Sequence, residues 1–308
     1  MNRREVIAAR MIAALTAVGL MCNSLPAAQA ADEESRAGHG SYSITYQYIK
    51  VDGYEGLNGK SPIGEVYTHT LNFEIDYHIT DRWTLVAGIP FVRERYEGDR
   101  PHDPLALDPP RPDVKNVDTG DWNQGFQDFH LGARYLARSG FLSIEPYVYL
   151  GIPSHDYEHF GHAAIGQNLW KVDVGSTFLY VPPISDAYYR LDLGYVFVEE
   201  TLGTNIDHWL IRAEAGYAFS EKINGRVFSI FKNGNGLTSG PADFPSRTSP
   251  RWFQHDRMLK HNFTTAGVGL DFALSRRHQL STAVLTMVQQ EQVHILEYAF
   301  VLSFSQLF

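Results

Sequence analysis

Hydrophobic and polar residues alternate one by one along most of this chain. Residues 71–79 show the pattern clearly, with Leu, Phe, Ile, Tyr and Ile at the odd positions and Asn, Glu, Asp and His at the even ones. Successive side chains of a β-strand point to opposite faces, so each alternating segment would have one hydrophobic and one polar face. The pattern therefore predicts an all-β protein.

The alternating segments number twelve. They lie at residues 42–48, 71–79, 83–91, 129–135, 142–152, 170–180, 189–197, 208–219, 223–232, 262–274, 279–288 and 295–308. Short connections (80–82, 138–140, 181–186, 220–222 and 275–278) alternate with long ones rich in Gly, Pro and Asp (52–64, 98–125, 154–167, 200–206 and 233–254). Residues 289–292 would be the one short connection on the long-loop side. An even strand number with this alternation of turns and loops is typical of outer-membrane barrels.

Two soluble all-β folds, the sandwich and the propeller, also contain strands of period two. Their hydrophobic faces pack inward and their polar faces meet water. They explain poorly the charged residues on the polar face of nearly every segment and the aromatic residues at the ends of the apolar face. In a membrane barrel the apolar face meets lipid, aromatic residues lie at the interfaces and the polar face lines the lumen. We therefore predict a transmembrane antiparallel up-and-down β-barrel of about 12 strands over residues 40–308.

The first 30 residues have the pattern of a cleaved secretion signal. Arg3, Arg4 and Arg10 accompany a hydrophobic stretch that is shorter than a bilayer span, and Ala28 and Ala30 fit the small-x-small cleavage rule. Residues 31–39 would then form a periplasmic N-terminal segment. No later stretch holds 18 consecutive apolar residues, which excludes a helical membrane protein.

The composition limits the modifications and partners that the mature chain can have. Cys22 is the single cysteine and lies inside the expected signal, so the mature chain would have neither a thiol nor a disulfide. Met21 before it argues against a lipidation site. The formal charge is −9, and the expected cleavage removes three Arg and one Glu, which would leave −11. This acidity argues against nucleic acid as a partner.

The end of the chain also resembles an outer-membrane protein. Phe308 follows an alternating strand, as in the sorting signal of outer-membrane barrels, although Gln306 stands where that signal has an apolar residue. We expect secretion through the periplasm and insertion in the outer membrane of a Gram-negative bacterium, as a monomer in contact with outer-membrane lipid.

Three stretches resemble the meta-pathway phenol-degradation (MetA-like) family of outer-membrane proteins. They are residues 80–92, 125–135 and 150–153, which contain Thr-Asp-Arg-Trp, Gly-Phe-Gln-Asp and Leu-Gly-Ile-Pro. Gln127 replaces the second glycine of the family's Gly-x-Gly-Asp motif, and Ser154 follows the last stretch where the family has Thr. The resemblance implies a barrel that moves aromatic or hydrophobic compounds and carries no catalytic residues or cofactor.

Charged side chains on the polar phase are the candidates for lining the lumen. They are Glu74, Asp76, Asp128, Arg134, Lys171, Asp173, Arg190, Asp192, Arg212, Glu214, Arg226 and Asp271. Ionised groups that face a lumen must be hydrated or paired. Because the signs are mixed, a salt-bridge lattice that braces the wall is favoured over a selectivity track.

The long loops carry two further groups. Aromatic residues near the ends of loops 98–125 and 233–254 are candidates for a gate: Trp122, Phe126, Phe244, Trp252 and Phe253. One loop also holds His155, His159 and His162, a composition that could bind a metal without a closed four-ligand spacing. We expect no metal there.

Three functions remain open. The first is a channel for passive uptake or export of a small solute. The second is a closed structural or adhesive barrel whose loops bind an external partner. The third, least favoured, is a lipid hydrolase that uses His261 with Ser281 or Thr282, because no orienting third group accompanies them.

Overall fold

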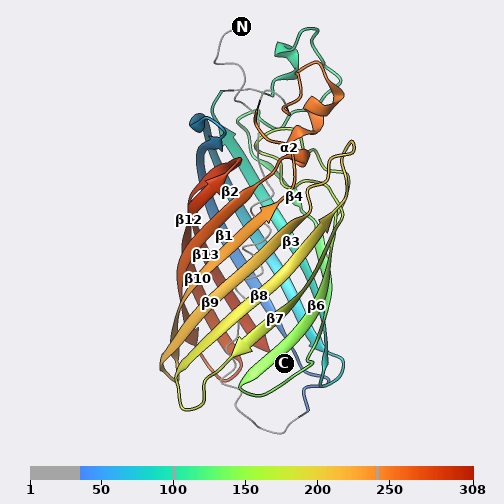
Figure 1. Ribbon diagram of the computed structural model, residues 1–308. Helices are drawn as coiled ribbons and strands as arrows, with labels where there is room; N and C mark the ends of the chain where they lie inside the picture. The colour runs from blue at the N-terminus through green and yellow to red at the C-terminus, as the bar shows by residue number, and fades with distance from the viewer. Residues whose placement is uncertain (1–34, 100–101, 241–242) are drawn as a thin grey trace.

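The computed structural model describes residues 35–99, 102–240 and 243–308 and shows one closed antiparallel β-barrel (Figure 1). The expected signal peptide, residues 1–30, lies outside the described residues. The strands are β1 (Gly40–Gly56), β2 (Gly59–His78), β3 (Trp83–Glu97), β4 (Asn123–Phe126), β5 (Phe129–Tyr135), β6 (Leu142–Ile152), β7 (Lys171–Tyr180), β8 (Ala187–Val198), β9 (His208–Ser220), β10 (Ile223–Gly234), β11 (Asn262–Ala273), β12 (His278–Glu291) and β13 (Val293–Leu307).

Twelve strand positions make up the wall, as predicted. β4 and β5 follow one another along the same neighbour, β3, and are separated only by Gln127 and Asp128. The backbone N–H of Gln127 still donates to the carbonyl of Pro90 on β3. The barrel closes where β1 pairs with β13 on one side and β2 on the other, while β2 also pairs with β3.

One connection differs clearly from the prediction in length. Residues 52–64 form almost no loop, because β1 and β2 continue to a turn at Leu57 and Asn58. Gly53 and Gly64 have φ values of 78° and 113°, and the β1–β2 register shifts between Asp52 and Tyr54. Glycine tolerates these positive φ values in a bulged strand, so the glycines that suggested a loop belong to bulged strands.

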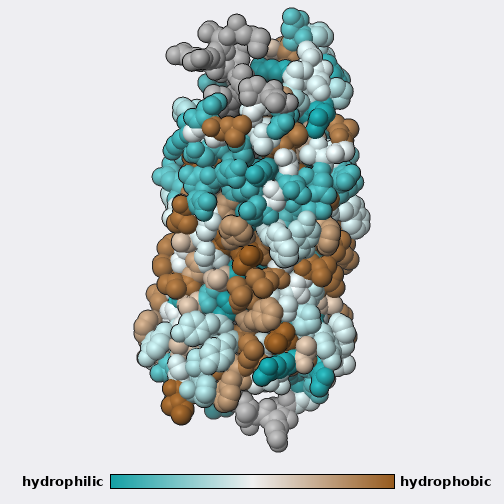
Figure 2. All heavy atoms as spheres, in the orientation of Figure 1, coloured by the Kyte–Doolittle hydropathy of each residue, from teal (hydrophilic) through white to brown (hydrophobic). Residues whose placement is uncertain are grey.

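The outward face of the wall is hydrophobic over the part that would meet lipid. On β3, the outward residues Trp83, Leu85 and Ile89 are 44–46% exposed, Ala87 among them is half-buried, and the outward position changes to Arg at residue 93. With the usual strand rise and a tilt of about 40°, the stretch from Trp83 to Phe91 covers about 20 Å of height, close to the ~25 Å apolar band of membrane barrels. Figure 2 shows hydrophobic residues over the middle and lower wall and hydrophilic residues gathered above them. No helix among the described residues is long and apolar enough to cross a membrane.

The long loops fold together into a cap over one end of the barrel (Figure 1). We use the name cap for the described residues among 98–122, 153–170 and 235–261. It contains two 3-10 helices, η1 (Pro104–Ala106) and η2 (Pro250–Gln254), and the short helix α2 (His255–Met258). Ser249 caps η2 by accepting a hydrogen bond from the N–H of Arg251. The short turns lie at the opposite end, with the C-terminus.

Candidate functional site

The interior of the barrel divides into two zones, of which the one nearer the short turns is ionic. All twelve predicted lumen residues are buried or half-buried, although they belong to strands whose outward neighbours are exposed. The cross-strand ion pairs of this zone are Glu74 with His130 (2.7 Å), Asp76 with Arg134 (2.9 Å), Glu214 with Arg226 (3.0 Å) and Asp271 with Arg226 (3.4 Å). Asp128 pairs with Lys171 (3.2 Å) at the cap end of the wall, where β7 begins and where Tyr157 of the cap also donates to Asp128. Arg190 pairs with Asp192 on the same strand at 3.1 Å. These contacts form a lattice that braces the wall.

Arg226 is the most buried cation of this lattice. Its side chain is 1% exposed, and those of Glu214 and Asp271 are 5% and 4% exposed. Tyr188 donates a 2.7 Å hydrogen bond to Glu214, and Asn224 donates one of 3.0 Å to Asp271. Because two carboxylates share one guanidinium, loss of Arg226 would leave two buried anions without their shared cation.

Inward-facing tyrosines are functional-site residues that sequence reasoning missed. The ring of Tyr149 lies over Gly132, where an added Cβ would be 2.0 Å from the ring, and Tyr188 lies over Gly216 in the same way. These glycines leave room for a ring to lie flat against the wall. The signal was present, because the tyrosines fall on the polar phase of their strands, opposite outward residues such as Val148 and Leu150.

The zone nearer the cap is apolar, a feature that the charged residues of the polar phase did not predict. Inward side chains there form one buried cluster: Ile49, Val51, Val66, Val196, Val198, Leu210, Phe228, Ile230, Phe263, Ala283, Leu285, Ala299 and Val301. The cap supplies Ala163, Ala164 and Leu169 to the same cluster, each no more than 1% exposed. Apolar wall residues are favoured here because they pack against the cap rather than face water. The cap thus fills the upper lumen in this structure.

Lys232 is an exception within this region. It is 6% exposed and lies on the inward phase of β10, two residues from Ile230. Among the described residues, no carboxylate lies within 4 Å of its ammonium group. An ammonium group buried without an ion-pair partner is costly in its charged form, so Lys232 is a polar group set into an apolar wall.

The five predicted gate aromatics do not act as one group. Phe244, Trp252 and Phe253 pack together in the cap with Phe160. Trp122 instead lies against the outward-facing Arg93 and Arg95, whose guanidinium carbons are 4.4 and 4.9 Å from its ring centre.

The prediction that Phe126 is a loop residue is wrong. It belongs to β4 and is 48% exposed, in contact with Phe91 on the outer wall. The polar residues around it hid the short strand, and neither Phe126 nor Trp122 faces the lumen.

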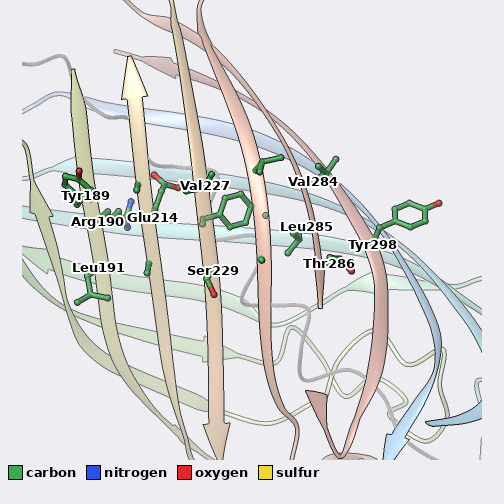
Figure 3. A pocket seen from close by; sticks show the side chains of 16 residues that line it. Tyr189, Arg190, Leu191, Glu214, Val227, Ser229, Val284, Leu285, Thr286 and Tyr298 are labelled. Atoms are coloured by element: carbon green, nitrogen blue, oxygen red, sulfur yellow. The ribbon is translucent and has the colours of Figure 1, made fainter. Parts of the chain in front are cut away.

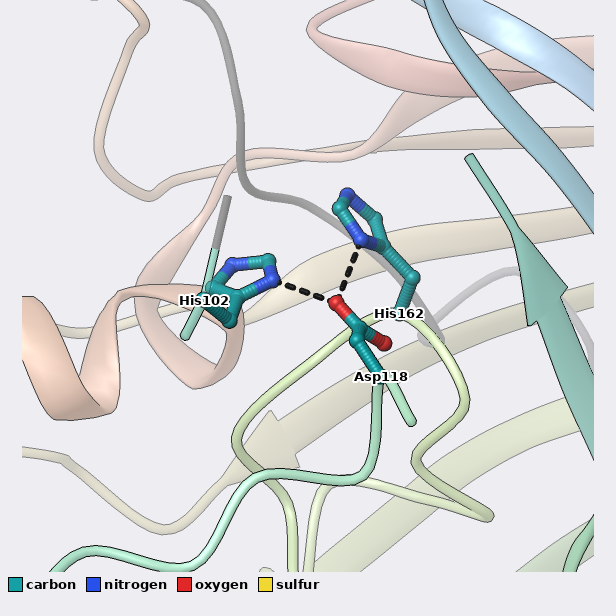
Figure 4. A group of neighbouring side chains, drawn as sticks. All are labelled: His102, Asp118 and His162. Carbon is teal, nitrogen blue, oxygen red and sulfur yellow. Dashed lines mark hydrogen bonds and ion pairs between the residues drawn. The ribbon is translucent and has the colours of Figure 1, made fainter. Parts of the chain in front are cut away.

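A buried carboxylate, Asp118, joins two segments of the cap (Figure 4). Its Oδ2 accepts hydrogen bonds from Nδ1 of His102 at 2.6 Å and Nδ1 of His162 at 2.8 Å. Its Oδ1 accepts the backbone N–H of Ala163 at 3.0 Å. Burial opposes the charged form of Asp118, but His162 and His102 outweigh it and hold its pKa well below the ordinary value. Burial likewise disfavours charged His102, but Asp256 and Asp118 together raise its pKa.

The histidines of the loop at residues 154–167 do not converge. His155 contacts Ser154 and Tyr157, and His159 bonds Gln254 at 3.1 Å. Only His162 of the three reaches Asp118. Burial lowers the pKa of His159.

The residues proposed for a hydrolase lie far apart. Asp271 pairs with Ser281 near the short turns, whereas His261 directly precedes the other end of β11. Ten residues of strand separate these positions by about 30 Å. Ser281 is also 3% exposed and faces inward rather than toward lipid. The suggested His261–Ser281 pairing is therefore wrong, and Thr282 is only one residue nearer.

A hollow of about 910 Å³ lies along β8 to β13 (Figure 3). Most of the side chains that line it face outward, and several are small, including Ala213, Ala215, Ser229 and Ala266. Tyr189 and Tyr298 stand at its two sides. The hollow therefore belongs to the lipid-facing surface and not to the lumen.

Comparison with known proteins supports the fold. No protein-family model and no curated protein matches this chain. Among solved structures it is similar to the COG4313 outer membrane channel from Pseudomonas putida F1, with a TM-score of 0.67 and 16% identity over 88% of this chain and 96% of that one. The likeness establishes an outer-membrane barrel fold.

Two further solved structures share the barrel more loosely. The NanC porin has a TM-score of 0.49 and 8% identity over 86% of this chain and 98% of its own. The CymD monoaromatic hydrocarbon channel has a TM-score of 0.43 and 10% identity over 88% of this chain and 89% of its own.

Proposed function

We propose that this protein is a non-catalytic outer-membrane channel for passive movement of a small solute, and that the cap is its gate. The observation that carries the proposal is the two-zone interior beneath a cover that is built from loops. The cap reaches the upper lumen through small and medium-sized side chains, whereas the lattice below is built into the strands. Withdrawal of the cap would expose the apolar zone without breaking the wall.

An aromatic or otherwise hydrophobic solute fits the upper zone best. Side chains such as Ile49, Ile230 and Leu285 offer apolar contact, and the amino group of Lys232 offers one polar partner beside them. Ligand sites commonly combine an apolar lining with a few placed polar groups. The resemblance to the phenol-degradation family agrees with this solute class.

The test is conductance and solute uptake after shortening the cap. Leu237 N–H donates to the carbonyl of Met258 at 2.7 Å, and Lys260 N–H donates to that of Leu237 at 3.0 Å, so the ends of segment 238–257 already lie side by side. Replacing this segment by a short Gly-Ser link removes Trp252 and Asp256, which hold Phe160 and Gly161 of the lumen-filling loop. We expect that this release increases single-channel conductance and phenol uptake into liposomes by tenfold or more. Replacing residues 182–185, in a turn at the opposite end, is the control and should change neither.

A closed structural barrel is the second candidate, because the loop residues Ala163 and Ala164 are 0% exposed within the upper lumen. It predicts neither conductance nor uptake in the shortened variant, even when that variant is folded. Such a result would overturn the channel proposal.

A further inference from the structure

A second set of buried histidines and carboxylates continues from Asp118 into the third segment of the cap. Asp256 Oδ2 lies 3.8 Å from Nε2 of His102 and accepts the N–H of Gly161 at 3.3 Å. Its Oδ1 lies 3.2 Å from Nε2 of His255. Residues His162, Asp118, His102, Asp256 and His255 thus form a continuous chain that joins all three cap segments.

These residues are unusually well buried for groups that carry or can carry charge. The side chains of His102, His162, His255 and Asp118 are 0% exposed, and that of Asp256 is 4% exposed. Among the described residues, no Lys or Arg nitrogen lies within 4 Å of either carboxylate; their ion-pair partners are histidines. A buried carboxylate without a firm cation is costly, and a metal ion would supply that charge.

The geometry points to a divalent transition-metal site formed by His102, Asp118 and His162, and we propose that it binds Zn²⁺. One nitrogen of each imidazole faces the same carboxylate oxygen (Figure 4), and the three ligand atoms lie within 4.8 Å of one another. Zinc takes imidazole nitrogen and carboxylate oxygen at about 2.0–2.2 Å in tetrahedral sites. Spreading the present 2.6 and 2.8 Å contacts by about half an ångström would admit the ion.

The surroundings also match the outer partners of zinc ligands. If His102 binds through Nδ1, its Nε2–H points toward Asp256, which reproduces the carboxylate–histidine–metal arrangement that fixes ring orientation. Asp118 Oδ1 is already held by the N–H of Ala163. The fourth position would be taken by water. Because Ala163 lies in the apolar cluster of the upper lumen, the ion would lock the segment that fills the lumen to its neighbour.

The first test is calorimetric titration of Zn²⁺ into the full mature protein in detergent, after removal of metals by a chelator. We expect one Zn²⁺ per chain with micromolar or tighter affinity. His102→Ala and His162→Ala should each lower the affinity by 100-fold or more, and Asp256→Asn by 10- to 100-fold. His155→Ala and His159→Ala are the matched controls, since these imidazoles lie away from Asp118, and they should bind zinc like the wild type.

Folding of each variant is checked by its heat-dependent mobility on gels. A second measurement on the unmutated protein does not depend on the variants: Co²⁺ should give the visible spectrum of a four-coordinate site that Zn²⁺ displaces. Absence of stoichiometric Zn²⁺ binding by the wild type, or equal loss in His155→Ala and His162→Ala, would overturn the proposal. The cluster would then be a hydrogen-bonded hub without metal.

Discussion

Replacing Arg226 by Met should destabilise the barrel strongly. The substitution keeps most of the side-chain volume but removes the cation shared by Glu214 and Asp271, whose side chains are 5% and 4% exposed. Removal of one member of a buried ion pair costs about 3–5 kcal/mol, because the remaining charge stays buried. Partial rearrangement of water in the lumen would reduce this cost, so we expect a loss of about 3 kcal/mol in the free energy of unfolding.

The assay is equilibrium unfolding by urea in lipid vesicles or detergent, followed by tryptophan fluorescence. Arg277→Met is the matched control, because Arg277 is exposed in a turn, and it should change stability by less than about 0.5 kcal/mol. The triple variant Arg226→Met, Glu214→Gln and Asp271→Asn should recover most of the loss, since no carboxylate then remains unpaired. If Arg226→Met is as stable as Arg277→Met, the lattice does not stabilise the wall and the reasoning is refuted.

Three further predictions follow from the cap and the wall. The raised pKa of His102 means that its stabilising effect is complete below its ordinary value of 6.5 and is lost as pH rises through the raised value. The lowered pKa of Asp118 means that its stabilising effect is complete above its ordinary value of 3.8 and is lost as pH falls toward the lowered value. In metal-free buffer, proteolysis of the cap should therefore increase from pH 6.5 upward, and His102→Asn should remove this dependence; a flat wild-type profile would contradict it. Gly132→Val should lower stability by about 1–3 kcal/mol because its side chain would strike the ring of Tyr149, and Tyr149→Ser should rescue it in urea unfolding. Ala163→Asp should place a charge in the apolar cluster, release the cap and raise conductance severalfold in planar bilayers, whereas Ala106→Asp, at the exposed end of η1, should not.

The wall could be predicted because the membrane imposes a strict rule on it. Outward residues must be apolar and backbone groups must be paired, so period-two alternation marks each strand and the even strand number follows. The prediction of a loop over residues 52–64 was wrong, because Gly53 and Gly64 lie in bulges of two paired strands. Phe126 was assigned to a loop for a related reason: β4 has four residues, too few for a period to show.

The interior was predictable only in part. The alternation of hydrophobic and polar residues predicts whether a charged side chain faces inward. It does not predict ion pairs such as Glu74–His130, which depend on the order of the strands and on their register. The apolar zone was missed because nothing next to an inward Ile or Val in the sequence marks it as a residue that packs against the cap. Ile49 and Ala163, for example, belong to one buried cluster but lie more than 100 residues apart in the chain. The His102–Asp118–His162 cluster was missed for the same reason, since long loops have no period from which contacts can be inferred.

The two-zone interior bears on how a closed channel could still admit a solute. Burial of Leu169 is worth about 2 kcal/mol, and the methyl groups of Ala163 and Ala164 add about 0.8 kcal/mol each, so these contacts hold the cap closed by about 3–4 kcal/mol. Each 1.4 kcal/mol changes a population tenfold, which leaves the withdrawn state at well below 1% from these contacts alone. A hydrophobic solute in the same place would regain similar apolar contacts, so its binding would offset most of the energy of opening. A polar solute would not, and the gate would therefore select by hydrophobicity before the ionic lattice is reached.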